Sequence, residues 1–265
     1  MIYICIGLTL IILLLISSFL LTGMIYFRIS CHYFFEIFFV HNAPLIVNTF
    51  VILQICTLIL FIKQRLVWLN EELSDLALIN ENWPQTQNQV SQSKVLYIFE
   101  KIRLKHLKLY EISNNINKIY SLQILLIIFK NFITLISEFL YYGKNVINNK
   151  HIDTKNMILS QIQLITAISQ IVALVFACSQ VSIQVEKTAS LIHNINSQDH
   201  CNEDLKMQVN FFSLQLLHEN LQFTACKIFV VNENLLLTIA GAVATYLVIV
   251  IQFQFGNSKQ PITNI

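Results

Sequence analysis

Long apolar stretches without charged side chains dominate this sequence. A helix that crosses the roughly 30 Å hydrocarbon layer of a bilayer needs about 20 mostly apolar residues. Charge-free stretches long enough to do so occupy residues 1–27, 43–62, 157–185 and 234–255. A further apolar stretch, 119–142, is interrupted by Lys130 and Glu138. The sequence therefore predicts an all-α membrane protein with five spanning helices, over 1–27, 43–62, 118–142, 157–180 and 233–255.

The composition also favours a location in lipid. Hydrophobic residues make up 55% of the chain and charged residues only 12%, whereas soluble globular chains have about 25% charged residues. So few polar side chains cannot cover a water-exposed surface, and we expect membrane lipid to be a partner. The net charge of +2 is too small to indicate nucleic-acid binding.

The first apolar stretch, 1–27, differs from a secretory signal peptide. It has no basic segment before it, and it is longer than the apolar region of about 7–15 residues that signal peptides carry. We expect it to be retained as a spanning helix. Because it starts at Met1 without a preceding loop, we also expect a segment to be missing upstream.

Basic residues set the expected orientation. Cytoplasmic loops of membrane proteins are enriched in Lys and Arg, and 63–117 is rich in them whereas 28–42 holds a single one. We therefore place 63–117, 186–232 and the N-terminus in the cytoplasm, and the tail 256–265 outside the cell. The lysines of the outer loop 143–156 oppose this orientation.

Two cytoplasmic segments have the periodicity of amphipathic helices. Apolar residues recur near helical spacing in 94–117 and again in 205–223. Such helices can lie on lipid headgroups or pack on each other. We favour mutual packing, because each helix can bury the apolar face of the other. The Gln-rich stretch 80–93, broken by Pro84, is expected to be a loop.

Residue types that often perform catalysis or hold metals lack the corresponding spacing. The chain has 6 cysteines and 7 histidines, but neither a CxxC pair nor an HExxH motif. It also lacks GxSxG and a glycine-rich phosphate loop. We therefore expect no catalytic residue, no metal and no cofactor, and we do not expect an enzyme.

The last predicted helix carries a polar stripe. Thr245 and Gln252 are seven residues apart, nearly two helical turns, so they share a face with Gly241 and Val248. An unpaired amide in hydrocarbon costs several kcal/mol, so this stripe should face protein or a water-filled path. One interpretation is tight helix packing with Gln252 as an interhelical hydrogen-bonding group. The other is the lining of a pore.

The same helix carries a family signature. The segment TYLVIVIQF, Thr245 to Phe253, resembles the Thr-Tyr, five-hydrophobic, Gln-Phe signature of insect gustatory receptors, with Thr245, Tyr246, Gln252 and Phe253 as its fixed residues. FSLQLLH and FTAC upstream resemble the segment that precedes this helix in the family. Lys227 stands where one branch of the family usually has glycine. Further similarities, in the same order as in the family, are Arg65, Leu69, Asn70, Leu73, Cys178, Glu186 and Thr188.

The resemblance implies a seven-helix fold with a cytoplasmic N-terminus, in which the five spans predicted here correspond to helices 3–7. It implies a plasma-membrane, non-selective cation channel, a homo- or hetero-tetramer with other gustatory receptors, opened by a small-molecule tastant such as a sugar or a bitter compound. The cytoplasmic segments 63–117, 180–200 and 205–226 would form an anchor. The last helix would line the pore, with pore and gate residues Thr245, Val248, Ile249, Gln252 and Phe253.

A ligand site is expected between the helices in their outer half. Candidates by position and chemistry are Asn48, Glu138, Tyr141, Gln163 and Gln170, although the same residues can serve as interhelical hydrogen-bond partners. Lys130 lies mid-span, too deep for its side chain to reach the headgroups. It should contact ligand, or else backbone carbonyls or pocket water.

Other classes remain as alternatives. A non-conducting or regulatory truncated relative of the same family is the first, and an unrelated multi-pass transporter is a minor one, because broken helices and repeats are not visible. A G-protein-coupled receptor is disfavoured, since the 3 prolines do not form that family's motifs.

Overall fold

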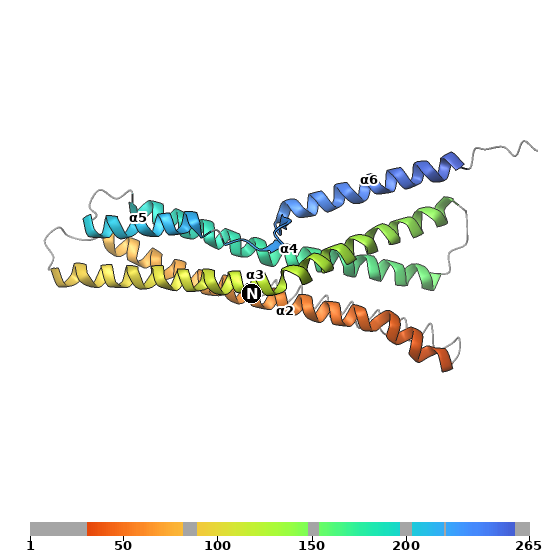
Figure 1. The fold of residues 1–265 in the computed structure, drawn as a ribbon, viewed down its shortest axis with the longest axis horizontal. Helices are drawn as coiled ribbons and strands as arrows, with labels where there is room; N and C mark the ends of the chain where they lie inside the picture. Colours follow the sequence, from red (N-terminus) through yellow and green to blue (C-terminus); the bar gives the residue numbers. More distant parts are fainter. Residues whose placement is uncertain (1–30, 82–88, 148–153, 197–202, 220, 258–265) are drawn as a thin grey trace, which may run out of the picture. The chain divides into compact units, whose positions relative to one another are not determined.

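The computed structural model describes residues 31–81, 89–147, 154–196, 203–219 and 221–257. Its helices are α2 (Cys31–Glu81), α3 (Gln89–Ile147), α4 (Thr154–Asn196), α5 (Glu203–His218) and α6 (Glu233–Asn257). Strands β1 (Thr224–Ala225) and β2 (Phe229–Val230) form a small hairpin between α5 and α6 (Figure 1). The expected all-α class is confirmed apart from this hairpin.

Four of the described helices are long and apolar enough to cross a membrane. The apolar segments are Pro44–Ala77, Ser93–Gly143, Met157–Ile195 and Glu233–Gln252. They overlap the predicted spans 43–62, 118–142, 157–180 and 233–255. The predicted first span, 1–27, lies outside the described residues.

The helices are longer than a bilayer requires. α2 has 51 residues and α3 has 59, whereas about 20 suffice to cross. Residues 63–81 and 89–93, which were expected in loops, are helical instead. In 63–81 the reason is an uninterrupted apolar face, because glycine and proline are absent and buried leucines recur at helical spacing: Leu66, Leu69, Leu73 and Leu76.

The charged part of α3 separates from its apolar part. Within Ser93–Gly143, residues 94–117 carry many charged side chains, whereas the stretch 119–142 carries only Lys130 and Glu138. We therefore expect the hydrocarbon crossing to use 118–142, with 94–117 outside it.

The chain divides into two compact units. Unit 1 comprises Met1–Gln54, Gln123–Val175 and Asn232–Ile265, and unit 2 comprises Ile55–Leu122 and Phe176–Val231. α6 belongs to unit 1, whereas α5 and the hairpin belong to unit 2.

The core of unit 2 confirms the packing favoured for the two amphipathic helices. Phe99 of α3 and Phe212 of α5 meet edge to face, with ring centroids 5.9 Å apart. Leu69 and Leu73 of α2 pack in the same cluster. The cluster is completed by Leu76, Ile102, Ile192, Ile195, Leu205 and Val209. Mutual burial of apolar faces therefore holds this unit together.

A polar network fixes α2 to α4 inside unit 2. Asn70 donates through Nδ2 to the Gln184 carbonyl oxygen at 2.9 Å, and its Oδ1 accepts a hydrogen bond from the Thr188 hydroxyl at 2.6 Å. Asn70 and Thr188 are both buried. Their pairing satisfies groups whose burial would otherwise destabilise the fold.

The hairpin turns through two left-handed residues. Cys226 has φ 50° and Lys227 has φ 60°, and the Ile228 N–H bonds to the Ala225 carbonyl at 2.9 Å. Asn117 of α3 holds β1 twice: its Oδ1 accepts from the Thr224 N–H at 2.9 Å, and its Nδ2 donates to the Thr224 hydroxyl at 3.1 Å. The chain is thereby fixed to α3 shortly before α6 begins.

Candidate pore helix and ligand site

One face of α6 packs in unit 1. The helix begins at Glu233, directly after Asn232, a residue type favoured before a helix start, and the Glu233 carboxylate complements the positive end of the helix dipole. Leu235, Ile239 and Val243, each four residues from the next, are buried. This face attaches the helix to the rest of its unit.

The opposite face of α6 carries the polar stripe predicted from the sequence. Gly241, Thr245, Val248 and Gln252 are all exposed, Val248 by 53%. Ile249, on the edge of the stripe, is exposed as well. Within the described part of the chain, therefore, the stripe is not used for packing.

The two polar side chains of the stripe differ in their partners. The Thr245 hydroxyl donates to the Gly241 carbonyl of its own helix at 2.9 Å, so it does not need an outside partner. The Gln252 amide forms no hydrogen bond with another side chain that the structure describes. Because an unpaired amide in hydrocarbon is costly, we expect Gln252 to meet water or another polar group outside the described residues. Phe253 lies in α6, and its side chain is outside the described part.

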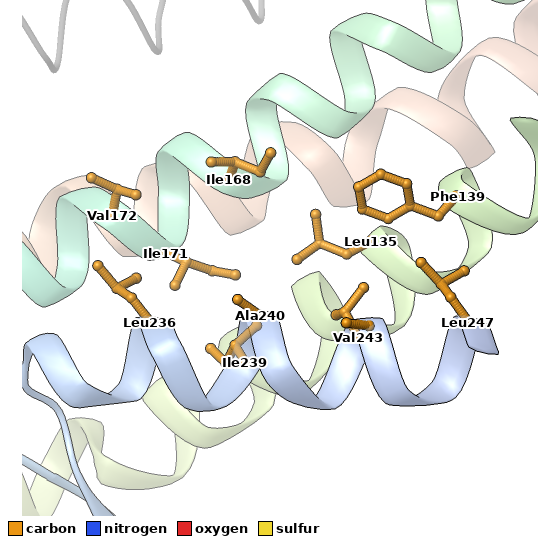
Figure 2. Close-up of a pocket in the computed structure, with 11 residues that line it drawn as sticks. Leu135, Phe139, Ile168, Ile171, Val172, Leu236, Ile239, Ala240, Val243 and Leu247 are labelled. Atoms are coloured by element: carbon orange, nitrogen blue, oxygen red, sulfur yellow. The ribbon is translucent and has the colours of Figure 1, made fainter. Parts of the chain in front are cut away.

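A groove in unit 1 lies along α6. Its volume is about 440 Å³, and α3, α4 and α6 form its walls (Figure 2). Every lining side chain is apolar: Leu135, Phe139, Ile168, Ile171, Val172, Leu236, Ile239, Ala240, Val243, Ala244 and Leu247. A groove of this chemistry suits an apolar molecule or an acyl chain, whereas a sugar needs polar partners.

The groove contains none of the ligand residues expected from the sequence. Asn48 and Gln170 instead contact each other, with Asn48 Nδ2 donating to Gln170 Oε1 at 3.1 Å. Gln170, 0% exposed, also donates to the Thr49 hydroxyl at 2.9 Å. These bonds connect α2 to α4, so Asn48 and Gln170 serve as interhelical hydrogen-bond partners, which was the alternative to ligand binding. Thr49 was not expected to take part.

The remaining candidates lie towards the adjacent ends of α3 and α4. Glu138 accepts a hydrogen bond from the Ser160 hydroxyl. Tyr141 packs edge to face on Tyr142, with ring centroids 6.0 Å apart. Gln163 is half-buried on α4. Their roles in ligand binding remain predictions.

Lys130 has a partner that neither sequence interpretation named. Its Nζ donates to the side-chain oxygen of the next residue, Asn131, at 3.1 Å. Asn131 is fully buried, and its Nδ2 has no hydrogen-bond partner among the described residues. A polar pair therefore lies in the middle of the predicted span of α3. In the described part of the chain, no group of three or more His, Cys, Asp or Glu side chains is placed to hold a metal ion.

Comparison with known proteins decides the family. The sequence profile of the 7tm chemosensory receptor family matches residues 2–257. The chain belongs to this family of chemosensory receptors. Among curated relatives, this chemosensory receptor is 27% identical over 238 residues to putative gustatory receptor 28b of Drosophila melanogaster, covering 80% of this chain and 50% of that protein. It is 30% identical over 164 residues to putative gustatory receptor 28a, covering 60% of this chain and 36% of the relative.

These relatives confirm the resemblance to insect gustatory receptors. The chain spans about half the length of the curated relatives it matches. Its fold is similar to that of the olfactory receptor OR5 from Machilis hrabei, with a TM-score of 0.73 at 13% identity, covering 95% of this chain and 66% of that one. The same receptor in complex with eugenol gives a TM-score of 0.72. The chain is thus a multi-pass membrane protein with the insect chemoreceptor fold.

Some site features had no signal in the sequence. Residues that line the groove and residues that face lipid are both apolar, so periodicity alone could not separate them. Asn131, beside Lys130, could have been noticed as a second polar residue in an apolar stretch.

Proposed function

We propose that this chain is a subunit of a ligand-gated, non-selective cation channel in the plasma membrane that detects a small-molecule tastant. The observation that carries the proposal is the division of α6 into a packed face and an exposed polar stripe, Gly241 to Gln252. In a symmetric ring of subunits such stripes can face one shared axis. Polar side chains there would line an open pore, and the apolar Val248 and Ile249 would close it by excluding water.

The proposal includes an assembly and an orientation. Four copies, alone or with related receptors, would surround the axis, with the N-terminus in the cytoplasm and the C-terminus outside. Its support is the distribution of basic residues, which are concentrated in 63–117, and the family to which the chain belongs.

The ligand is proposed to be small and largely apolar rather than a sugar. The groove beside α6 offers only apolar side chains, and one of its walls is the proposed pore helix. A molecule that binds the groove more tightly in one position of α6 than in another would shift the equilibrium between closed and open states.

The first test is the ligand-evoked current of cells that express the chain at their surface. We expect Gln252→Ala to change the relative permeability of cations, because Gln252 would lie in the conducting path. Val250→Ala is the matched control, since Val250 is two residues away and half-buried on another side of α6. Equal effects of the two variants would contradict pore lining by Gln252, and a surface-expressed chain without current would favour the non-conducting relative.

A further inference from the structure

A second cleft, in unit 2, has a different chemistry from the groove beside α6. It has a volume of about 330 Å³ and lies between α2 and α3. Its lining comprises three cations, one carboxylate, one indole and two leucines: Arg65, Lys105, Lys108, Glu72, Trp68, Leu69 and Leu109. Cations therefore outnumber carboxylates by three to one in this cleft.

The cations are held in different ways. The guanidinium carbon of Arg65 lies 4.7 Å from the centre of the Trp68 ring, an arrangement that keeps the Arg65 charge in place without neutralising it. Lys105 Nζ lies 2.6 and 2.8 Å from the two carboxylate oxygens of Glu72. Neither Arg65 nor Lys108 forms an ion pair with a carboxylate in the described part of the chain. Both are exposed and open to an anion.

The Arg65 end of the cleft lies at the depth of the lipid headgroups, and the cleft extends from there away from the bilayer. The predicted crossing of α2 ends at residue 62, and Arg65 follows three residues later, about 4.5 Å along the helix axis. The headgroup layer extends roughly 5–7 Å beyond the hydrocarbon on each side. Trp68, 47% exposed, is of a residue type enriched at this interface.

The charges define the kind of anion. Arg and Lys bind phosphate oxygens through charge-assisted hydrogen bonds. Lys105 is already paired with the Glu72 carboxylate, so a ligand must carry enough negative charge to compete with that carboxylate for Lys105. A zwitterionic headgroup does not carry that much negative charge, whereas a headgroup with phosphomonoester groups does. Basic pockets at the cytoplasmic side of spanning helices are suited to such lipids.

We propose that this cleft binds the phosphorylated inositol headgroup of an anionic lipid in the cytoplasmic leaflet. The leaflet depends on the orientation given under the proposed function. Binding of the headgroup to the cleft depends neither on this orientation nor on ion conduction by the chain. A site at this position would couple the lipid composition of the membrane to the unit built from α2, α3, α4 and α5.

The test uses the purified full chain in phosphatidylcholine nanodiscs, titrated with fluorescent short-chain phosphatidylinositol bisphosphate. We expect Arg65→Gln and Lys108→Gln each to weaken binding about tenfold, as for the loss of one charge-assisted contact. Lys94→Gln is the control, because it removes the same charge from α3 about 16 Å from Lys105 along the helix, and it should bind as the wild type does.

A gain of affinity separates the proposal from misfolding. Glu72→Gln releases Lys105 for the ligand and should tighten binding, an effect that a damaged protein would not produce. Soluble inositol trisphosphate distinguishes a membrane lipid from a free inositol phosphate as the ligand. If the soluble compound binds more weakly than the lipid, the membrane lipid is supported as the ligand. If the two bind equally, the membrane lipid is overturned as the ligand. Equal binding by Arg65→Gln, Lys108→Gln and Lys94→Gln would overturn the site, as would equal binding of phosphatidylserine at the same total charge.

Discussion

His106 is a titratable residue in an apolar environment. It is fully buried in unit 2, both ring nitrogens are without a hydrogen-bond partner among the described residues, and the ring meets Phe212 at 5.4 Å. It lies in 94–117, outside the hydrocarbon crossing expected for α3. Burial lowers the pKa of His106 from 6.5 to about 4, because the charged ring would lose its hydration.

This burial predicts loss of stability in acid. Between about pH 6.5 and pH 4 the unfolded chain binds a proton at His106 and the folded chain does not, so the free energy of unfolding falls as pH falls through this window. The loss is at most about 3 kcal/mol. The expected result is that His106→Phe, which keeps an aromatic ring and removes the nitrogens, flattens the dependence of Tm on pH in detergent. Parallel pH profiles for the two proteins would refute this account.

Lys227 is a residue in a backbone conformation that glycine adopts without cost. At φ 60° a side chain crowds the following carbonyl, which costs roughly 1–2 kcal/mol, and glycine is usual at this position in one branch of the family. We therefore expect Lys227→Gly to raise the free energy of unfolding by up to about 1 kcal/mol, after the greater flexibility of glycine in the unfolded chain is counted. A lower Tm for this variant would show that the lysine side chain has a stabilising role.

At the scale of elements, α6 is both a wall of the apolar groove and the proposed pore helix. Ala244 lines the groove, and Ala244→Phe should fill part of it. With toluene as an apolar probe, we expect the wild-type Tm to rise with ligand concentration, by the linkage between binding and stability. The variant should lose most of this rise.

The matched control is Ala242→Phe, which adds the same ring to the same helix at an exposed position outside the groove. It should keep the wild-type response to toluene. Equal responses of both variants would place apolar ligands elsewhere, and the sites around Asn48 and Gln170 would then be the next to examine.

The elements also show what local sequence can reveal. The predicted spans 43–62, 118–142, 157–180 and 233–255 correspond to helices because a long apolar stretch in lipid can satisfy its backbone only within itself. The pairing of α3 with α5 followed from the period of their apolar residues. The continuation of α2 through 63–81 was not predicted, because the charge-free stretch that defines the span ends at residue 62. The groove was missed because it is apolar like the lipid-facing surface.

At the scale of the whole molecule, the described part of the chain buries only one face of α6. The Thr245–Gln252 stripe is exposed in unit 1, and the family signature coincides with it. Sequence could place both on one helix, but only packing could show that the described residues do not cover the stripe. The stripe is therefore the part of the molecule from which an assembly and a conducting path are inferred.

The most direct test of this inference is the modification of Gln252→Cys by a charged, membrane-impermeant thiol reagent during current recording. Cys56 and Cys178 are buried, and the unsubstituted chain gives the background from the native cysteines. The account predicts that the reagent blocks the current of Gln252→Cys and not that of Val250→Cys. Block of both variants alike, or of neither while both conduct, would contradict a pore lined by this face of α6.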